Sequence, residues 1–97
     1  MGQFRSLMER ELRIRGYADN TRQAYLGCVR RLVAYYMVPP DQLTLDDVNR
    51  YQLHLTRDRQ VGWSSFNQAV SALRFFFVVV LRRDWNLWHL PYQRTRR

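Results

Sequence analysis

The stretch SSFNQAVSALRFFF, residues 64 to 77, carries polar side chains at a spacing that could recognise a ligand. At the 3.6-residue period of a helix, its apolar residues gather on one side and its polar residues on the other. We define the polar stripe as Ser64, Asn67, Gln68, Ser71 and Arg74. Asn and Gln can form paired hydrogen bonds with adenine, Arg with guanine, and Ser can hold phosphate. The stripe is therefore typical of a helix in the major groove of DNA, although an ordinary solvated face has the same polarity.

A second polar sector occurs on the preceding helical pattern, around Gly27 and Ala34, with Gln23, Arg30 and Arg31. These arginines, with Arg22, are candidates for contact with phosphate. A glycine inside a helix costs about 1 kcal/mol relative to alanine. Gly27 is easier to understand if something packs closely against it, which could be DNA or another helix.

The charge of the chain favours a polyanionic partner. Its formal net charge is +8, its pI is about 10.8, and all 16 basic residues are arginines. The preference for arginine fits phosphate and guanine recognition, but a GC-rich genome produces it as well. We expect double-stranded DNA rather than a membrane surface, because no helical pattern combines an exposed apolar face with flanking basic residues.

Membrane insertion and secretion are not expected. The longest apolar run, FFFVVVL, is much shorter than the roughly 20 residues that a membrane span needs. The first residues lack the apolar core of a signal peptide. A cytoplasmic protein, associated with the nucleoid when bound to DNA, is the prediction.

Residues that could perform catalysis are scattered. Cys28 is the only cysteine and shares an apolar helix face, which favours a core thiol over a nucleophile. His54 and His89 are far apart in the sequence, and Asp46 with Asp47 suits the first turn of a helix better than a metal pair. We predict no catalytic residue, no metal site and no cofactor, and a standalone enzyme would need a cluster that this chain lacks.

Four helical patterns position these residues. The first, FRSLMERELRIRG, stops at Gly16, and the second starts at Asp19, Asn20 or Thr21, any of which could cap it, and ends before VPP. Thr44 marks the start of the third. The fourth runs from 64 to about 82 after a polar loop, with Ser64 or Ser65 as its cap.

No pattern alternates with the period of a strand, so the fold class is all-α. Residues 1–83 would form one four-helix domain with a single core, and the basic, proline-containing residues 84–97 a C-terminal extension.

Three of these stretches, in this order, resemble a known family. The second pattern, ADNTRQAYLGCVRRL, supplies a Thr and a Tyr four residues later; LTLDDVNRYQLHL is similar to the third helix; SSFNQAVSALRFFF matches an Asn followed by Ser-Ala-Leu-Arg and aromatic residues. The chain resembles the N-terminal SAM-like, core-binding domain of tyrosine recombinases and phage integrases. This resemblance implies a four-helix SAM-like orthogonal bundle that forms one jaw of a clamp around DNA.

The resemblance also implies which residues face DNA. Thr21 would cap the second helix and meet phosphate together with Arg22, while the residues of the fourth helix would lie in the groove. Ala18 departs from the family, which often has Ser there, so that cap or phosphate contact would come from Asp19 or Asn20, or be absent. The predicted DNA-binding residues are Asn20, Thr21, Arg22, Gln23, Arg30, Arg31, Ser65, Asn67, Gln68, Ser71 and Arg74.

In this family the tyrosine nucleophile and its partners lie in a separate catalytic domain, and no tyrosine here matches a nucleophile position. The leading hypothesis is thus a DNA-binding domain of a site-specific recombinase, acting in DNA integration and recombination, that could self-associate on DNA through its parent protein. The alternative is a helical protein interaction module that docks partners through exposed Phe75, Val78, Trp85 and Trp88. A binding affinity that falls steeply as salt rises would favour DNA as the partner over a protein bound through an apolar interface.

Overall fold

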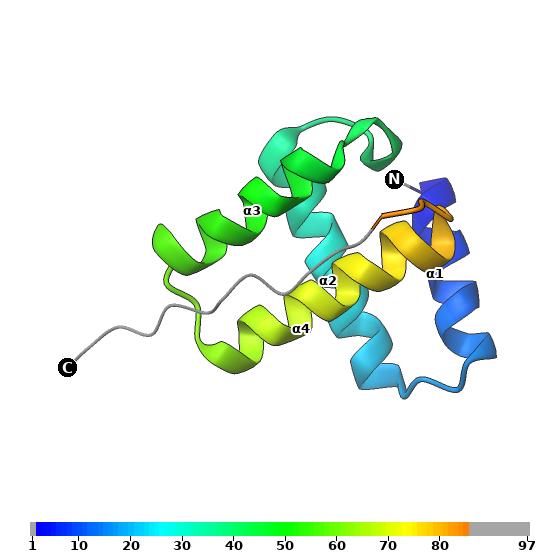
Figure 1. Ribbon diagram of the computed structural model, residues 1–97. Helices are drawn as coiled ribbons and strands as arrows, with labels where there is room; N and C mark the ends of the chain where they lie inside the picture. Colours follow the sequence, from blue (N-terminus) through cyan, green and yellow to red (C-terminus); the bar gives the residue numbers. More distant parts are fainter. Residues whose placement is uncertain (1, 86–97) are drawn as a thin grey trace.

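The computed structural model describes residues 2–85, which form helices that cross one another at steep angles (Figure 1). In chain order these are α1 (Gly2–Ile14), α2 (Asp19–Tyr36), the short η1 (Pro40–Gln42), α3 (Leu45–Arg57), α4 (Trp63–Arg74) and η2 (Phe75–Val80), which continues α4. In Figure 1, α4 crosses in front of α2, with α3 above it and α1 near its far end. The described residues contain four α-helices and no strand, which confirms the all-α prediction.

A single hydrophobic core lies where α2 and α4 pack against each other, since these two helices form the most extensive contact between elements. Of the seven apolar residues that the helical period places on the inward side of the fourth pattern, Val80 is half-buried and the other six are buried: Phe66, Ala69, Val70, Leu73, Phe76 and Phe77. α2 contributes Val29 and Leu32, and α1 contributes Met8 and Leu12, all with 1% exposure or less. The helical period therefore correctly predicted which side of α4 is buried.

The start of α3 is fixed by local hydrogen bonds, as Thr44 predicted. The Asp47 amide donates to Thr44 Oγ1 at 3.1 Å, and the Thr44 amide donates to Asp47 Oδ2 at 3.0 Å, which completes a capping box. Asp46 lies in the same turn and pairs with Arg50 at 2.8 Å. Both aspartates thus have the helix-start roles that the sequence indicated.

The predicted caps of α2 and α4 were wrong. Ala18 and Gly62 occupy the capping positions, and neither has a side chain that makes a capping hydrogen bond. The Ala18 carbonyl accepts from the Arg22 amide and the Gly62 carbonyl from the Phe66 amide, both at 2.9 Å. Because the first helical hydrogen bonds start at Ala18 and Gly62, the predicted polar caps lie inside the first turn of each helix: Asp19 to Thr21 in α2, and Ser64 and Ser65 in α4.

The predicted fourth helix, 64 to about 82, is observed as helix from Trp63 to Val80, but its change of winding was not predicted. α4 ends at Arg74 and continues as the wider, π-helical η2, after which Arg82 adopts a left-handed φ of 57°. The change in winding coincides with three consecutive buried phenylalanines, each with a different partner. Phe75 packs against Tyr17, Phe76 against Phe4 of α1, and Phe77 against Trp85.

The predicted extension, residues 84–97, lies outside the described residues except for Asp84 and Trp85, so a domain boundary near 83 stays a prediction. The ring of Trp85 stacks on Phe77 with centroids 4.9 Å apart. Phe75, predicted as an exposed anchor for a partner, is only 7% exposed. That part of the interaction-module prediction was wrong, because Tyr17 and Tyr25 cover the Phe75 ring.

Candidate nucleic-acid interface

The predicted DNA-contacting residues come from α2 and α4, and the crossing of these helices brings several of them together. Two pockets join the helices: one links late α2 to early α4, and the other links early α2 to late α4. Exposed members of the predicted set are Asn20, Gln23, Arg30, Arg31, Ser65, Gln68 and Arg74; Thr21, Asn67 and Ser71 are half-buried. Asn20, Gln23 and Arg30 are exposed on α2 and line neither pocket.

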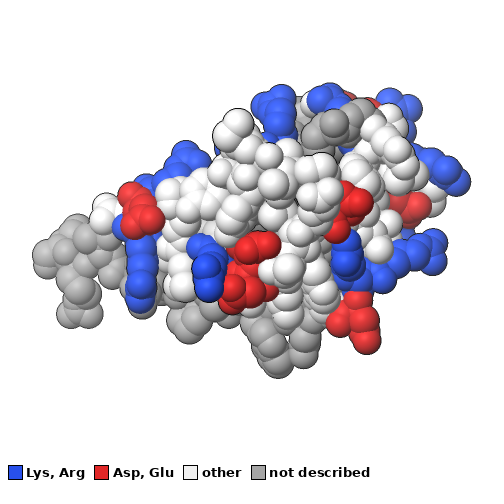
Figure 2. All heavy atoms as spheres, turned by 90° about the horizontal axis from the view of Figure 1, so that it is seen from above, with Lys and Arg blue, Asp and Glu red and all other residues white. Residues whose placement is uncertain are grey.

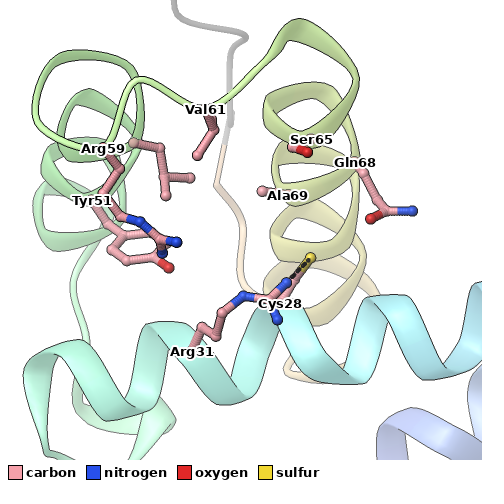
Figure 3. Close-up of a pocket in the computed structure, with 9 residues that line it drawn as sticks. Cys28, Arg31, Tyr51, Arg59, Val61, Ser65, Gln68 and Ala69 are labelled. Atoms are coloured by element: carbon pink, nitrogen blue, oxygen red, sulfur yellow. Dashed lines mark hydrogen bonds between the residues drawn. The ribbon is translucent and has the colours of Figure 1, made fainter.

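The central pocket has a volume of about 220 Å³ and lies between α2, α3 and α4 (Figure 3). Arg31, Ser65 and Gln68 of the predicted set line it. Figure 3 shows Arg31 rising from α2 toward Cys28, whereas the Gln68 amide points away from the centre of the pocket. The pocket therefore has a basic floor and carries an amide at its rim.

Cys28 belongs to the floor of this pocket and behaves as a core thiol. Its side chain is 4% exposed, and Arg31 Nη2 donates to its Sγ at 3.5 Å. Burial raises the pKa of the Cys28 thiol, and the nearby Arg31 only partly opposes this rise. The thiol is therefore protonated at neutral pH, which disfavours a nucleophilic role, because the thiolate is the reactive form.

The aromatic pocket, of about 320 Å³, lies at the other end of the α2 and α4 contact. Ser71 and Arg74 of the polar stripe line it together with Tyr17, Tyr25 and Phe75. Burial raises the pKa of the Tyr25 hydroxyl, with a smaller increase from Tyr17, while a hydrogen bond with Ser71 opposes these effects. Ser71 thus has a partner within the protein, and Arg74 is the exposed charged group of this pocket.

Arg22 has an internal role that the sequence did not suggest. Its Nη1 donates to the Tyr17 carbonyl at 2.8 Å and its Nη2 to Asp19 Oδ1 at 2.9 Å, and its side chain is 17% exposed. The guanidinium therefore joins the segment before α2 to the first turn of that helix. Arg22 is therefore engaged within the chain, and its contact with phosphate stays a prediction.

Gly27 is not explained by helix packing within the described chain. A Cβ atom built on it would meet only Nη1 of Arg31, at 3.4 Å, which is the mobile end of a side chain. No other helix of the described part approaches this position closely. Packing of another helix against Gly27 is therefore not observed in residues 2–85, and close approach by DNA stays a prediction.

Acidic residues are almost absent from the two crossing helices. Within α2 and α4 the only acidic residue is Asp19, and Arg22 binds it. Each ion pair found in the described residues joins groups three or four positions apart in the chain. Figure 2, which views the molecule from above Figure 1, shows basic and acidic side chains interspersed on that face. Of the four α-helices, α2 and α4 therefore carry the fewest acidic residues, so phosphate would meet little repulsion from their own side chains.

Metal chemistry and membrane insertion find no support in residues 2–85. No group of three or more His, Cys, Asp or Glu in this range could hold a metal ion. Its helices are also too short or too polar to cross a membrane.

Two residues at the central pocket were missed by sequence reasoning. Tyr51, expected simply as a core residue of the third helix, is 4% exposed and lines the pocket. Arg59 reaches the same pocket from the loop between α3 and α4. The only sequence signal was a basic residue in a polar loop, and nothing local indicates that Arg59 shares a pocket with Arg31 of α2.

Comparison with known proteins agrees with this architecture. The family described as "Phage integrase, N-terminal SAM-like domain" matches residues 4–87. The candidate integrase/recombinase y4qK of Sinorhizobium fredii is 34% identical over 85 residues, which are 88% of this chain and 28% of that protein. The candidate integrase/recombinase y4eF of the same organism is 45% identical over 40 residues, 41% of this chain and 16% of that protein.

The chain therefore spans less than a third of the length of these relatives. No solved structure gives a significant match. The helical architecture, the acid-poor crossing of α2 and α4 and the family match over residues 4–87 agree with one another. The chain belongs to the family of phage integrase N-terminal SAM-like domains.

Proposed function

We propose that this chain binds double-stranded DNA through the crossing surface of α2 and α4 and that it serves site-specific recombination. The single observation that supports this most strongly is the composition of that surface. It presents exposed Arg30, Arg31 and Arg74 with the amides of Asn67 and Gln68, and its one acidic side chain is already paired. Guanidinium groups can bind phosphate or guanine, and amides can bind adenine.

Within this proposal the chain contributes DNA binding and supplies no catalytic group. The names of the relatives describe integrase/recombinase proteins more than three times as long as the matched segment. The described titratable groups instead have structural roles: Cys28 is a buried thiol, and Asp47 caps α3. Strand cleavage would require groups outside this chain, such as the family's separate catalytic domain.

The interaction-module alternative loses its main support. Phe75 is buried, Trp85 is half-buried against Phe77, and Trp88 lies outside the described residues. Within residues 2–85, these aromatic side chains therefore do not form an exposed cluster on which a partner could dock. DNA binding remains the better proposal because α2 and α4 expose several candidate residues and carry a single acidic residue, which is paired.

An NMR titration tests the proposed function. The ¹⁵N-labelled chain is titrated with a duplex of about 20 base pairs at low and at moderate salt. We expect the signals of Asn67, Gln68 and Arg74 to shift, together with amides of early α2, and the shifts to shrink as salt rises because phosphate contacts release counterions. Shifts that are absent at low salt would contradict DNA binding by this surface.

Gly27→Ala should change stability and DNA binding in opposite directions. Alanine favours the helix by about 1 kcal/mol relative to glycine, and the new methyl group meets only the Arg31 side chain. Urea unfolding should therefore show a more stable protein. Duplex affinity, measured by fluorescence anisotropy, should fall if the DNA backbone approaches Gly27 closely. Unchanged affinity would show that DNA does not approach this position.

A further inference from the structure

Two arginines from different elements line the central pocket. Arg31 lies on α2, and Arg59 comes from the loop after α3 (Figure 3). Both are exposed, and within the described residues neither makes an ion pair. The described lining of the pocket contains no acidic residue. The fold therefore brings two positive charges to one pocket, and no acidic residue in the described lining balances them.

The hydroxyl of Tyr51 lies within the electrostatic influence of both arginines. Burial raises the pKa of Tyr51, and the positive charges of Arg31 and then Arg59 both oppose this rise. Each guanidinium thus lies close enough to influence the same phenolic oxygen. In Figure 3 the Arg59 guanidinium lies beside the Tyr51 ring, and Arg31 points into the space between α3 and α4.

We infer that the central pocket binds one backbone phosphate of DNA between Arg31 and Arg59, with the Tyr51 hydroxyl as a further donor. This inference rests on the proposed function and names a contact outside the two crossing helices. Guanidinium groups present paired N–H donors that match phosphate oxygens. The Gln68 amide points away from the pocket, so the donors that face its interior suit an anion better than a base edge.

The position of the pocket explains why the ligand is a phosphate of duplex DNA. Ser65 and Gln68 of α4 form part of its rim, so a strand lying along the polar stripe passes its opening. A phosphate held there would tie the α3–α4 loop to the same strand that α4 reads. Arg59 would then fix the register of α4 on the duplex without reading any base, as phosphate contacts generally do.

Arg59→Gln tests this inference, with Arg57→Gln as the matched control. Both residues are exposed and both changes remove one positive charge, but Arg57 lies at the end of α3 and lines a different depression with His54. Duplex affinity of the 97-residue chain is measured by fluorescence anisotropy at several salt concentrations. We expect a loss of about three- to tenfold for Arg59→Gln, and a salt slope smaller by about 0.9, as for one lost phosphate contact. The control should lose less than about twofold, because it removes only long-range attraction.

The outcomes separate the two proposals. If the unchanged protein binds the duplex and the two variants bind equally well, the pocket assignment is overturned while DNA binding stands. If the unchanged protein binds no duplex even at low salt, the proposed function is contradicted. The assignment of a DNA phosphate to the central pocket is then contradicted as well. A direct readout is the NMR signal of each Arg Nε–H group: shifts at both Arg31 and Arg59 on duplex addition support the pocket, and a shift at neither overturns it.

Discussion

Replacing Phe76 by alanine is expected to lower the free energy of unfolding by about 3–5 kcal/mol. Its side chain is fully buried, meets Phe4 edge-on at a centroid distance of 6.3 Å and packs against Phe77 at 5.1 Å. Truncation would leave a cavity between η2 and α1, which the surrounding side chains can fill only in part. Domains of this size are stable by about 5–15 kcal/mol, so the variant would lose a large fraction of its stability.

Urea unfolding followed by circular dichroism measures this loss. Ile14→Ala is a suitable control, because Ile14 is 67% exposed at the end of α1 and surface substitutions usually change stability by less than about 0.5 kcal/mol. If Phe76→Ala lost no more than the control, the packing of η2 against α1 would be contradicted.

Arg74→Ala is expected to weaken binding to a preferred DNA site by about 1–3 kcal/mol, which is the usual value of an arginine that reads a base edge. Arg74 is the last residue of α4 and is exposed beside the aromatic pocket. From there its guanidinium can extend beyond the helix surface toward a groove. The stability of the fold should change little, because its side chain is not part of the core.

A panel of duplexes with different sequences measures this effect, with Arg30→Ala as the comparison. Arg30 is exposed on α2 and is proposed to contact phosphate, so its removal should weaken binding to all sequences alike and reduce the salt slope by about 1. Arg74→Ala should instead reduce the differences between sequences. Equal losses on every duplex would assign Arg74 to the backbone rather than to a base.

The elements of this fold follow closely from apolar periodicity. The buried side of α4 could be predicted because Phe66, Val70 and Leu73 recur at the helical period, and each is fully buried. The start of α3 could be predicted because the side chains of Thr44 and Asp47 each bond to the other's backbone amide, three residues away. Helical periodicity and the capping box both involve residues that are close together in the chain, so the amino-acid sequence alone is enough to predict them.

The features that were missed depend on tertiary structure. Local preference placed a polar cap on α2, but Ala18 caps it, and the guanidinium of Arg22 bonds to the Tyr17 carbonyl instead of remaining free. The π-helical winding of η2 depends on partners that α1 and Tyr17 supply. Arg59 lines the central pocket from the α3–α4 loop, and no residue near it in the sequence indicates this position.

The candidate surface was predicted in part. Arg31, Ser65 and Gln68 do lie together at one pocket, since their helical phases on α2 and α4 point to the same side of the crossing. DNA contact by these side chains stays a prediction. The aromatic pocket joins Ser71 and Arg74 to two tyrosines that periodicity could assign only to the core or its edge.

The ion pairs of the described residues are confined to neighbours within single helices or their ends, whereas the helices are held to one another by buried apolar side chains. Screening by salt weakens exposed ion pairs and phosphate contacts but leaves apolar packing intact or strengthens it. If the chain binds DNA as proposed, a rise in ionic strength should weaken that binding while the packing of the helices persists. The domain would then leave DNA in its folded state.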